Sequence, residues 1–380
     1  MLVGMFKNSS LYNPIPSRNP VGVRNRRNVV LAQMAKYDYI TQKEKDSLQK
    51  TELDLDFTPE THREGIATYF REYLRGFMKE WANNQNNRKP DGSKYDLYSD
   101  GLKIFTTIDS RMQQYAEDAV ALHMPRLQTE FNHQNKSNKT EPFLELDQSE
   151  IKKLMNDGMK RGERWRILKK QGKSEKEIRA SFNEPIEMRV FKWVDGKVGE
   201  VDTVMKPIDS MRYYKSFLRT GMMSMDPITG HVKAWVGGMD YKHFQYDMVK
   251  QGKRQVGSTF KPFVYATAID QLQLSPCDSF PRSPITIEAN KFGNPESWTV
   301  KNSDGNYSGV QTLKDALASS TNTITARLMN EIGPQPVVEM ARKLGVEQDI
   351  LPVPAIALGT PDISVYEMVA AYSTFANKGV

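Results

Sequence analysis

The sequence predicts a multidomain chain of mixed α/β class, in which an antiparallel sheet is flanked by helices. At 380 residues, the chain exceeds the usual size of one domain. Two turn signals, Asp195–Gly196 and Asp226–Gly230, each separate runs of residues that favour strands, which is the pattern of a β-hairpin. Other segments repeat apolar residues with the period of an amphipathic helix. Sheet and helix are therefore expected in the same chain.

The composition excludes several classes of protein. Hydrophobic residues make up 38% of the chain and charged residues 26%, which excludes a disordered protein. The longest apolar run, Met368–Tyr372, is far shorter than the roughly 20 residues that a membrane span needs. Cys277 is the only cysteine, so an intramolecular disulfide and a thiolate metal cluster are excluded. The histidines lack metal-ligand spacing, and we expect neither a metal nor a cofactor.

The N-terminal part is expected to be helical after an irregular start. Three prolines in residues 10–20 predict a loop. Helical spacing of apolar residues follows in residues 21–40. Thr41 with Glu44 has the pattern of a capping box, which predicts the start of a second helix. A third, amphipathic helix is predicted over residues 66–81.

The middle of the chain begins with a connector of polar, turn-rich residues at 83–101. Residues 102–108 have strand character, and Asp109 fits the N-cap position of the helix that follows. The segment 186–206 predicts two strands joined by an Asp-Gly turn, and 222–236 predicts a second hairpin. The second hairpin is expected to start the antiparallel sheet.

Residues 151–180 carry the charge asymmetry of the chain. They contain eleven Lys or Arg against four Asp or Glu, and their net charge of +7 equals that of the whole chain. Widely spaced apolar residues such as Met155 and Trp165 favour helices whose charged side chains face water. A basic module that binds nucleic acid is an alternative, but aromatic residues do not alternate with the basic ones. Contact with anionic lipid or with a glycan polymer is left open by the sequence.

The spacing Ser-x-x-Lys occurs three times, so the spacing alone is a weak signal. It joins Ser47 to Lys50, Ser149 to Lys152, and Ser258 to Lys261. Only the third pair follows a hairpin and a glycine, and only there does a proline follow the lysine. Because proline is tolerated in the first turn of a helix and not deeper, a helix must begin close to Ser258.

A helix that begins at this serine has consequences for its chemistry. The three-residue spacing puts Lys261 on the same face as Ser258, within side-chain reach. Ser258 would lie at the positive end of the helix dipole, where a developing oxyanion is favoured. A serine hydroxyl needs a neighbouring base, and a lysine can be that base if burial lowers its pKa. A helix with a capping serine and a surface lysine fits the same motif.

Residues 312–333 predict two helices joined by a polar turn. The five residues Ser319–Thr323 favour local bonds between side chain and backbone over helix. Ser320 and Asn322, two residues apart, are placed to project from this turn. An ordinary turn between two helices is the alternative interpretation when this segment is taken alone.

Together with their surroundings, these two elements resemble the class A penicillin-binding proteins. The first two matching stretches are KRQVGSTFKPFVYATAID and DALASSTNTITARL. The stretches GMMSMDPITGHVKAWVGGMDY and ALGTPDISVYEMVAAYSTFANKGV are also similar to the transpeptidase domain of this family. Two further stretches match parts of the family that precede this domain. The stretch FTTIDSRMQQYAEDAV resembles the segment that leads into the transpeptidase domain. The stretch LYNPIPSRNPVGVRNRRNVVLAQMAKYDYIT resembles the last helices of the glycosyltransferase domain before it. The stretches follow the order of the family, and the basic segment 151–180 is the main part without a match.

The resemblance implies three parts of the chain. Residues 1–80 would be the C-terminal helical end, or remnant, of a glycosyltransferase domain. Residues 81–220 would be a linker region with a charged insertion and a β-rich part. Residues 221–380 would be the N-terminal part of a penicillin-binding transpeptidase domain. That fold has an antiparallel sheet flanked by helices, and here it would be incomplete at its C-terminus.

The resemblance also implies a role for each candidate residue. Ser258 would be the acylated nucleophile, and its backbone N–H would supply half of an oxyanion hole. Lys261 would be the base that takes the serine proton. Ser320 would relay a proton toward the leaving amine, and Asn322 would hold the substrate amide and help to position Lys261. The implied reaction is acyl transfer from a peptide stem ending in D-Ala-D-Ala, as in DD-transpeptidases, with β-lactams trapped at the first step.

The sequence departs from the family pattern in two places. Neither Lys-Thr-Gly nor Lys-Ser-Gly occurs where the family has its third motif, on the edge strand that supplies the other oxyanion N–H. The catalytic acid of the glycosyltransferase domain and the membrane anchor are expected upstream of Met1. The chain is therefore expected to be an internal fragment of a bifunctional enzyme, and to have little or no activity alone.

The expected partners are peptidoglycan stem peptides and glycan strands, together with β-lactam antibiotics. The full-length protein is expected at the exocytoplasmic (periplasmic) face of the inner membrane, held by an anchor outside this chain and without nucleic-acid partners. Two other functions stay open. One is a non-catalytic scaffold or sensor that keeps the penicillin-binding fold. The other is a basic module that binds polyanions through residues 151–180.

Overall fold

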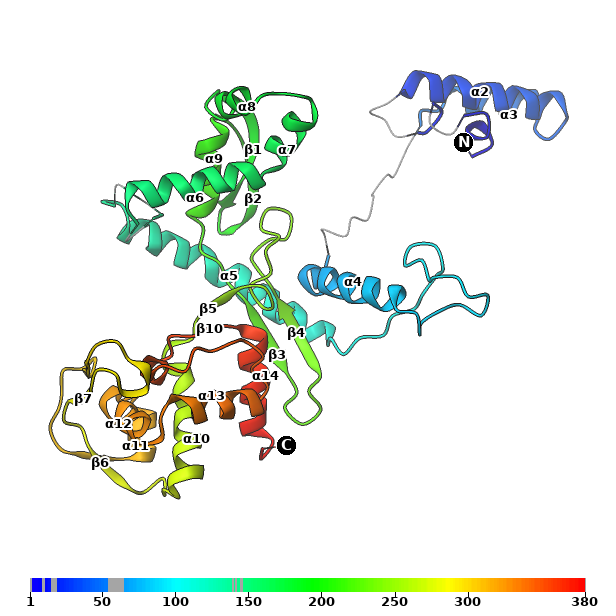
Figure 1. Ribbon diagram of the computed structural model, residues 1–380. Helices are drawn as coiled ribbons and strands as arrows, with labels where there is room; N and C mark the ends of the chain where they lie inside the picture. Colours follow the sequence, from blue (N-terminus) through cyan, green and yellow to red (C-terminus); the bar gives the residue numbers. More distant parts are fainter. Residues whose placement is uncertain are drawn as a thin grey trace. The chain divides into compact units, whose positions relative to one another are not determined.

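The computed structural model describes residues 2–8, 11–14, 19–53, 65–138, 140, 142–143 and 146–379. The chain divides into two compact units, Met1–Thr61 and His62–Val380 (Figure 1). Each unit has its own internal packing and is described here by itself.

The first unit is helical, as the sequence predicts. Its helices are α1 (Leu2–Met5), α2 (Pro20–Lys36) and α3 (Gln42–Lys50). The predicted capping box at the start of α3 is confirmed, because Thr41 and Glu44 each accept a hydrogen bond from the backbone N–H of the other. The predicted loop 10–20 lies partly outside the described residues.

The second unit begins with two long helices that pack on one hairpin. They are α4 (Thr68–Asn83) and α5 (Ser110–Gln134), and the hairpin is β3 (Met222–Met225) with β4 (Val232–Val236). The predicted cap of α5 is confirmed, because the Asp109 carboxylate accepts from the N–H groups of Arg111 and Met112. Helix α4 therefore packs with the hairpin, although the predicted first domain runs to residue 80.

The predicted strand at residues 102–108 is wrong. This segment forms no strand, and its side chains from Lys103 to Thr107 are exposed. It meets β4 only at its end, where Thr107 Oγ1 donates to Val232 O and Asp109 N donates to Lys233 O. A run of residues with strand character forms a β-strand only when its backbone is hydrogen-bonded to a neighbouring strand, and this segment lacks such a partner along its length.

The basic segment is helical, as expected, and folds into three short helices. They are α6 (Gln148–Arg161), α7 (Glu163–Lys170) and α8 (Glu175–Ser181). Most of their apolar residues point inward, and Met155 and Trp165 are among the buried ones. The predicted hairpin beside them is confirmed as β1 (Ile186–Val194) paired with β2 (Lys197–Met205), in register from Val194–Lys197 outward. Asp195 and Gly196 both have positive φ, as a two-residue turn of this type requires.

The sheets are all antiparallel and two-stranded in the part of the chain that the structure describes. Besides β1–β2 and β3–β4, three pairs of very short strands lie near the C-terminal helices. These strands are β5 (Lys253–Gln255), β6 (Ser279–Pro281), β7 (Ile285–Ile287), β8 (Trp298–Val300), β9 (Val310–Thr312) and β10 (Asp362–Ser364). They pair as β5 with β10, β6 with β9, and β7 with β8. The fold is mixed α/β, as predicted.

The largest core of the molecule is built by the helices that follow β5. These are α10 (Lys261–Leu272), α11 (Leu313–Ala318), α12 (Asn322–Ile332), α13 (Pro334–Lys343) and α14 (Val365–Ala376). Helix α10 lies at its centre and contacts α11, α12 and α13. Phe263, Ile324 and Leu328 are fully buried here. The remaining helices of the unit are α9 (Pro207–Lys215) and the 3₁₀ turns η1 (Gly257–Phe260), η2 (Lys291–Gly293) and η3 (Pro354–Leu358).

Tyr69 joins α4 to the rest of the second unit. Its ring is 5% exposed, and its hydroxyl donates to Phe244 O at 2.6 Å. A Cβ at Gly238 would lie 2.2 Å from this hydroxyl, so the close approach requires glycine there. Among the described helices, none combines the length and apolar character needed to span a bilayer.

Candidate active site

Ser258 lies on the tight turn that precedes α10. The turn η1 runs from Gly257 to Phe260, and Lys261 and Pro262 open the helix, as the position of the proline predicts. The Ser258 side chain is exposed. Within the described residues, its hydroxyl has no hydrogen-bond partner. The hydroxyl is therefore accessible from outside at the start of a buried helix.

A second segment braces this turn through backbone contacts. Gly257 N donates to Gly359 O at 2.8 Å, and Val256 N donates to Pro361 O at 3.0 Å. A Cβ at Gly359 would lie 1.7 Å from Gly257 O, and Gly359 has a φ of +77°. Both the spacing and the dihedral angle therefore require glycine at position 359.

Helix α14 holds the turn from another side. Tyr372 OH donates to the backbone carbonyl of Thr259, the residue after Ser258, at 2.7 Å. Burial raises the pKa of Tyr372, so this phenol stays protonated and keeps its donor. The turn that carries Ser258 is thus fixed on both flanks by contacts with residues 100 or more positions later in the chain.

Lys261 is the buried centre of the site. Its side chain is 0% exposed, and Nζ donates to three acceptors. These are Ser320 O at 2.6 Å, Ser320 Oγ at 2.9 Å and Asn322 Oδ1 at 2.7 Å. The three residues were predicted from two separate motifs, and the fold brings them together across the α10–α12 contact.

The polar turn between α11 and α12 presents these acceptors. Helix α11 ends at Ala318 and α12 begins at Asn322, which confirms the predicted break in the helix. Ser320 has a φ of +56°, an uncommon left-handed conformation for a residue with a side chain. Asn322 Nδ2 donates to Lys301 O at 3.1 Å, which leaves its carbonyl oxygen directed at Lys261. Lys301 follows β8 and was not predicted to take part.

Burial lowers the pKa of Lys261 to about 8. A buried ammonium is disfavoured because it has lost its water, and here its three partners are all uncharged. No carboxylate pairs with Lys261 among the residues that the structure describes. A lysine with a pKa this close to neutrality can exist in part as the free amine, which is the form that accepts a proton.

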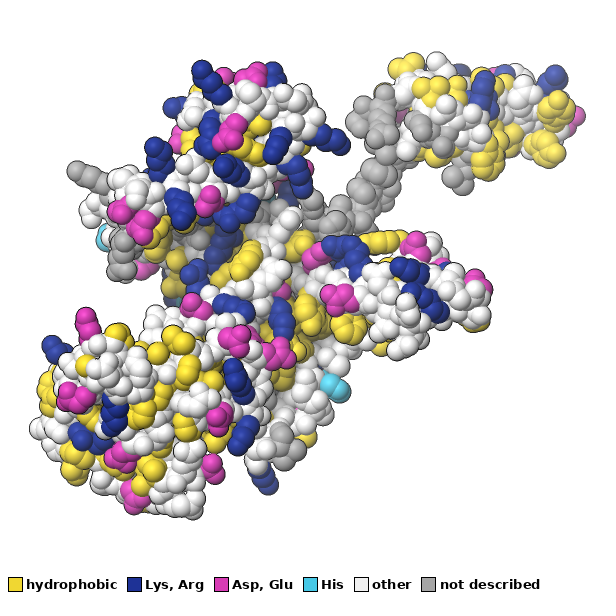
Figure 2. Space-filling model, in the orientation of Figure 1, with side chains coloured by type: hydrophobic (Ala, Val, Ile, Leu, Met, Phe, Trp, Pro, Cys, Tyr) yellow, Lys and Arg dark blue, Asp and Glu magenta, His cyan; other side chains and the backbone are white. Residues whose placement is uncertain are grey.

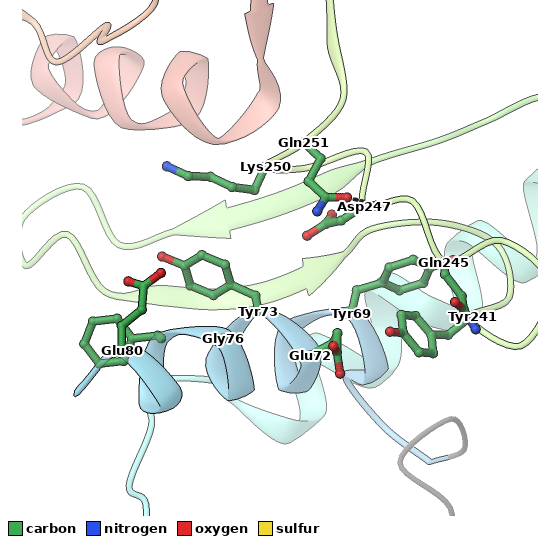
Figure 3. Close-up of a pocket in the computed structure, with 11 residues that line it drawn as sticks. Tyr69, Glu72, Tyr73, Gly76, Glu80, Tyr241, Gln245, Asp247, Lys250 and Gln251 are labelled. Atoms are coloured by element: carbon green, nitrogen blue, oxygen red, sulfur yellow. Dashed lines mark hydrogen bonds between the residues drawn. The ribbon is translucent and has the colours of Figure 1, made fainter. Parts of the chain in front are cut away.

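A separate cavity of about 390 Å³ lies between α4 and the loop after β4 (Figure 3). Tyr69 and Tyr73 line one side, and Asp247 and Lys250 line the other. None of the four predicted site residues contributes to it. The Asp247 carboxylate already has hydrogen-bond partners there, because it accepts from Trp235 Nε1 and from Val249 N. The chemistry of the predicted residues therefore lies elsewhere in the unit.

Two family models match the chain. Residues 138–218 match the penicillin-binding protein middle domain, and residues 220–380 match the penicillin-binding protein transpeptidase domain. The chain belongs to the penicillin-binding proteins. The first of these models covers the whole of the basic segment 151–180, which the resemblance had left unmatched.

Individual relatives agree with the family models. A penicillin-binding protein 1A from Neisseria cinerea is 27% identical over 100% of this chain and 48% of its own length. Another from Rickettsia felis is 28% identical over 96% of this chain and 46% of its own length. The predicted membership of the class A penicillin-binding proteins is confirmed by these matches. The chain spans about half the length of the curated relatives it matches.

A solved structure shares the fold. Penicillin-binding protein 1A from Haemophilus influenzae superposes with a TM-score of 0.60 at 22% identity. The match covers 98% of this chain and 55% of the solved one. The predicted fold class is thereby confirmed.

Proposed function

We propose that this chain carries the serine acyl-transfer centre of an enzyme that crosslinks peptidoglycan. The observation that carries the proposal is the bonding of buried Lys261 to Ser320 and Asn322, three residues after the accessible Ser258 on the turn that precedes α10. The transpeptidase family of residues 220–380 supports the same chemistry. Ser258, Lys261, Ser320 and Asn322 are proposed as the catalytic residues.

In the first step, Ser258 Oγ attacks the carbonyl of the penultimate D-Ala of a stem peptide. The serine proton passes to Lys261 Nζ, which must be neutral to accept it. The new C–O bond gives a tetrahedral intermediate whose oxyanion meets the N–H of Ser258. The C–N bond to the terminal D-Ala then breaks, and the proton reaches the leaving amine through Ser320 Oγ, 2.9 Å from Lys261 Nζ.

In the second step, the amine of another stem attacks the ester on Ser258. The new C–N bond forms as the amine loses a proton to the Lys261–Ser320 pair. The C–O bond to Ser258 then breaks and the proton returns to Ser258 Oγ, which leaves a peptide crosslink and the free serine. A β-lactam follows only the first step, because its opened ring stays on the serine. A second oxyanion donor is expected on a further strand, and in a comparable hydrolase one such donor is worth roughly 10²–10³ in rate.

The proposed setting is the cell envelope, with peptidoglycan stem peptides and glycan strands as partners and β-lactams as inhibitors. An anchor in the membrane and a position on its periplasmic side belong to the same proposal. Names of relatives such as penicillin-binding protein 1A support this setting.

The reaction can be tested with the full-length gene product and a synthetic pentapeptide ending in D-Ala-D-Ala. We expect release of D-Ala from the wild type and none above background from Ser258→Ala. Ser149→Ala is the matched control, because Ser149 has the same spacing to a lysine but lies in α6. Release that survives in Ser258→Ala would contradict the proposal. Absence of release from every form would favour the scaffold interpretation.

A further inference from the structure

The charge of the second unit is concentrated on one group of helices. Residues 151–180 carry a net charge of +7, so the rest of the chain sums to zero. Figure 2 shows dark blue side chains gathered over α6, α7 and α8. Most apolar side chains of these helices are turned into two small cores, with Met159 and Trp165 in one and Ile151 and Met155 in the other. The charges are therefore left on the outer surface.

Most of these cations have no acidic partner. Three of them pair within the segment, as Arg166–Glu163, Lys173–Glu177 and Arg179–Glu175. Those pairs use three of the four acidic residues of the segment. Seven others are exposed and form no ion pair within residues 151–180 or with other described residues: Lys152, Lys153, Lys160, Arg161, Lys169, Lys170 and Lys176. We call these seven residues the basic face.

The positive charges also extend to the neighbouring helix. Burial lowers the pKa of Lys215 at the end of α9, and the charges of Arg161 and Arg219 lower it further. Like charges are therefore close enough to act on one another, and a surface of opposite charge would relieve their repulsion.

We propose that the basic face docks on the headgroups of an anionic lipid bilayer. Six of its seven members are lysines, which act as point charges and lack the planar fork with which arginine grips an individual phosphate. A fluid layer of anionic headgroups suits such diffuse contacts. The only exposed large apolar side chain on these helices is Ile167, at 47% exposure, so attraction comes from charge with little insertion.

Nucleic acid fits this surface less well. Binding of single strands uses aromatic side chains on which bases stack, and the one tryptophan of the segment, Trp165, is 8% exposed. An anionic polysaccharide is the nearest competitor, and the experiment separates it from lipid.

The experiment measures sedimentation of the protein with vesicles of phosphatidylcholine, with and without phosphatidylglycerol. The test variant is the triple substitution Lys152→Glu, Lys153→Glu, Lys176→Glu, which removes positive charge from the basic face. All three positions lie in the N-terminal half of a helix, α6 or α8, where the helix dipole favours glutamate, so the variant should still fold. Binding to the anionic vesicles should fall by roughly 100-fold, since each of the three lysines near such a surface contributes a roughly fivefold step. Added salt should weaken wild-type binding in the same direction.

The matched control is Lys103→Glu, Lys314→Glu, Lys343→Glu, which changes the net charge equally at exposed lysines outside the basic face. The proposal predicts nearly wild-type binding for the control. Equal losses in both triple variants, or equal binding of the wild type to neutral vesicles, would overturn it. Retention on an anionic polysaccharide without binding to vesicles would also overturn it. Penicillin labelling of Ser258 should be the same in all three proteins, so a failure here is distinct from a failure of the proposed reaction.

Discussion

At the scale of single residues, Lys261 decides what the site can do. It is fully buried with three uncharged acceptors, and no acidic residue among those described holds its proton in place. The three contacts fix its position, while burial weakens its hold on the proton. A lysine that is both fixed and easily deprotonated is what a nearby serine nucleophile requires.

The pH dependence of acylation should follow the free amine of Lys261. The pKa of Lys261 is lowered to about 8, so most of the side chain is charged at pH 6 and most is neutral at pH 10. The rate of acylation by penicillin should rise roughly tenfold per pH unit below this pKa and level off above it. Stopped-flow or gel-based labelling across this range checks the prediction. A rate that is flat or that falls with pH would exclude Lys261 as the base.

Changing Asn322 to Asp should move that pH profile. A carboxylate at the Oδ1 position, 2.7 Å from Lys261 Nζ, would favour the charged amine and raise its pKa by roughly 1–3 units. Acylation at neutral pH should fall, and the midpoint of the profile should move upward. Asn330→Asp on the same helix is the control, because Asn330 bonds Lys291 and not Lys261. An unchanged midpoint of the pH profile in Asn322→Asp would show that Asn322 and Lys261 do not act together as proposed.

At the scale of elements, the turn before α10 depends on a segment that is remote in sequence. Gly359 closes η3 and meets Gly257 so closely that no side chain fits. Tyr372 of α14 holds the next residue of the same turn. The position of Ser258, the proposed nucleophile, is thus set by two elements that begin about a hundred residues later.

Gly359→Ala should therefore damage both stability and acylation. Its Cβ would lie 1.7 Å from Gly257 O, so the turn carrying Ser258 must move. Gly309→Ala is a matched control, since Gly309 has a φ of +78° but no atom within 4 Å of its added Cβ. The control should lose only about 1–2 kcal/mol through its backbone strain and should still acylate. Similar effects of both variants on labelling and on thermal unfolding would contradict this account.

The elements that could be predicted from the sequence are those specified by neighbouring residues. The Asp195–Gly196 hairpin and the cap at Asp109 form as predicted, because a turn or a cap is specified by neighbouring residues. The three-residue strands β5 to β10 were not predicted, since a strand so short shows no alternating pattern. Residues 102–108 show the converse, because they have the pattern but no partner strand.

The candidate site shows the same difference between features that neighbouring residues specify and features that depend on distant parts of the chain. Ser258 and Lys261 were predicted from spacing, proline position and resemblance, and Ser320 and Asn322 from a polar break between helices. Their convergence on one ammonium depends on packing between α10 and α12, which no local pattern contains. The carbonyl of Lys301 and the brace at Gly359 were missed, because a backbone contact leaves little trace in the sequence.

At the scale of the whole molecule, α4 belongs with the unit that contains the site. Tyr69 packs with Trp235 and Tyr241 and bonds to Phe244 O, so the helix completes the cover over β4. The boundary between the two units lies near residue 61, before this helix.

Truncation can locate the boundary. A chain that begins at residue 65 should keep the unfolding temperature of the second unit, whereas one that begins at residue 84 should be much less stable. In the intact chain, Tyr69→Ala should cost about 3–5 kcal/mol, as the loss of a buried aromatic side chain usually does. Thermal unfolding followed by circular dichroism measures all three. Equal stability of the two truncated chains would place the boundary after α4 instead.

The most direct test of the central claim is to locate the bound antibiotic by mass spectrometry. After incubation of the full-length gene product with penicillin, we expect one adduct of the intact antibiotic on the peptide that contains Ser258. Ser258→Ala should carry none, while Ser47→Ala, at another Ser-x-x-Lys site, should be labelled normally. An adduct on a different residue, or one that persists in Ser258→Ala, would contradict the assignment of Ser258 as the nucleophile.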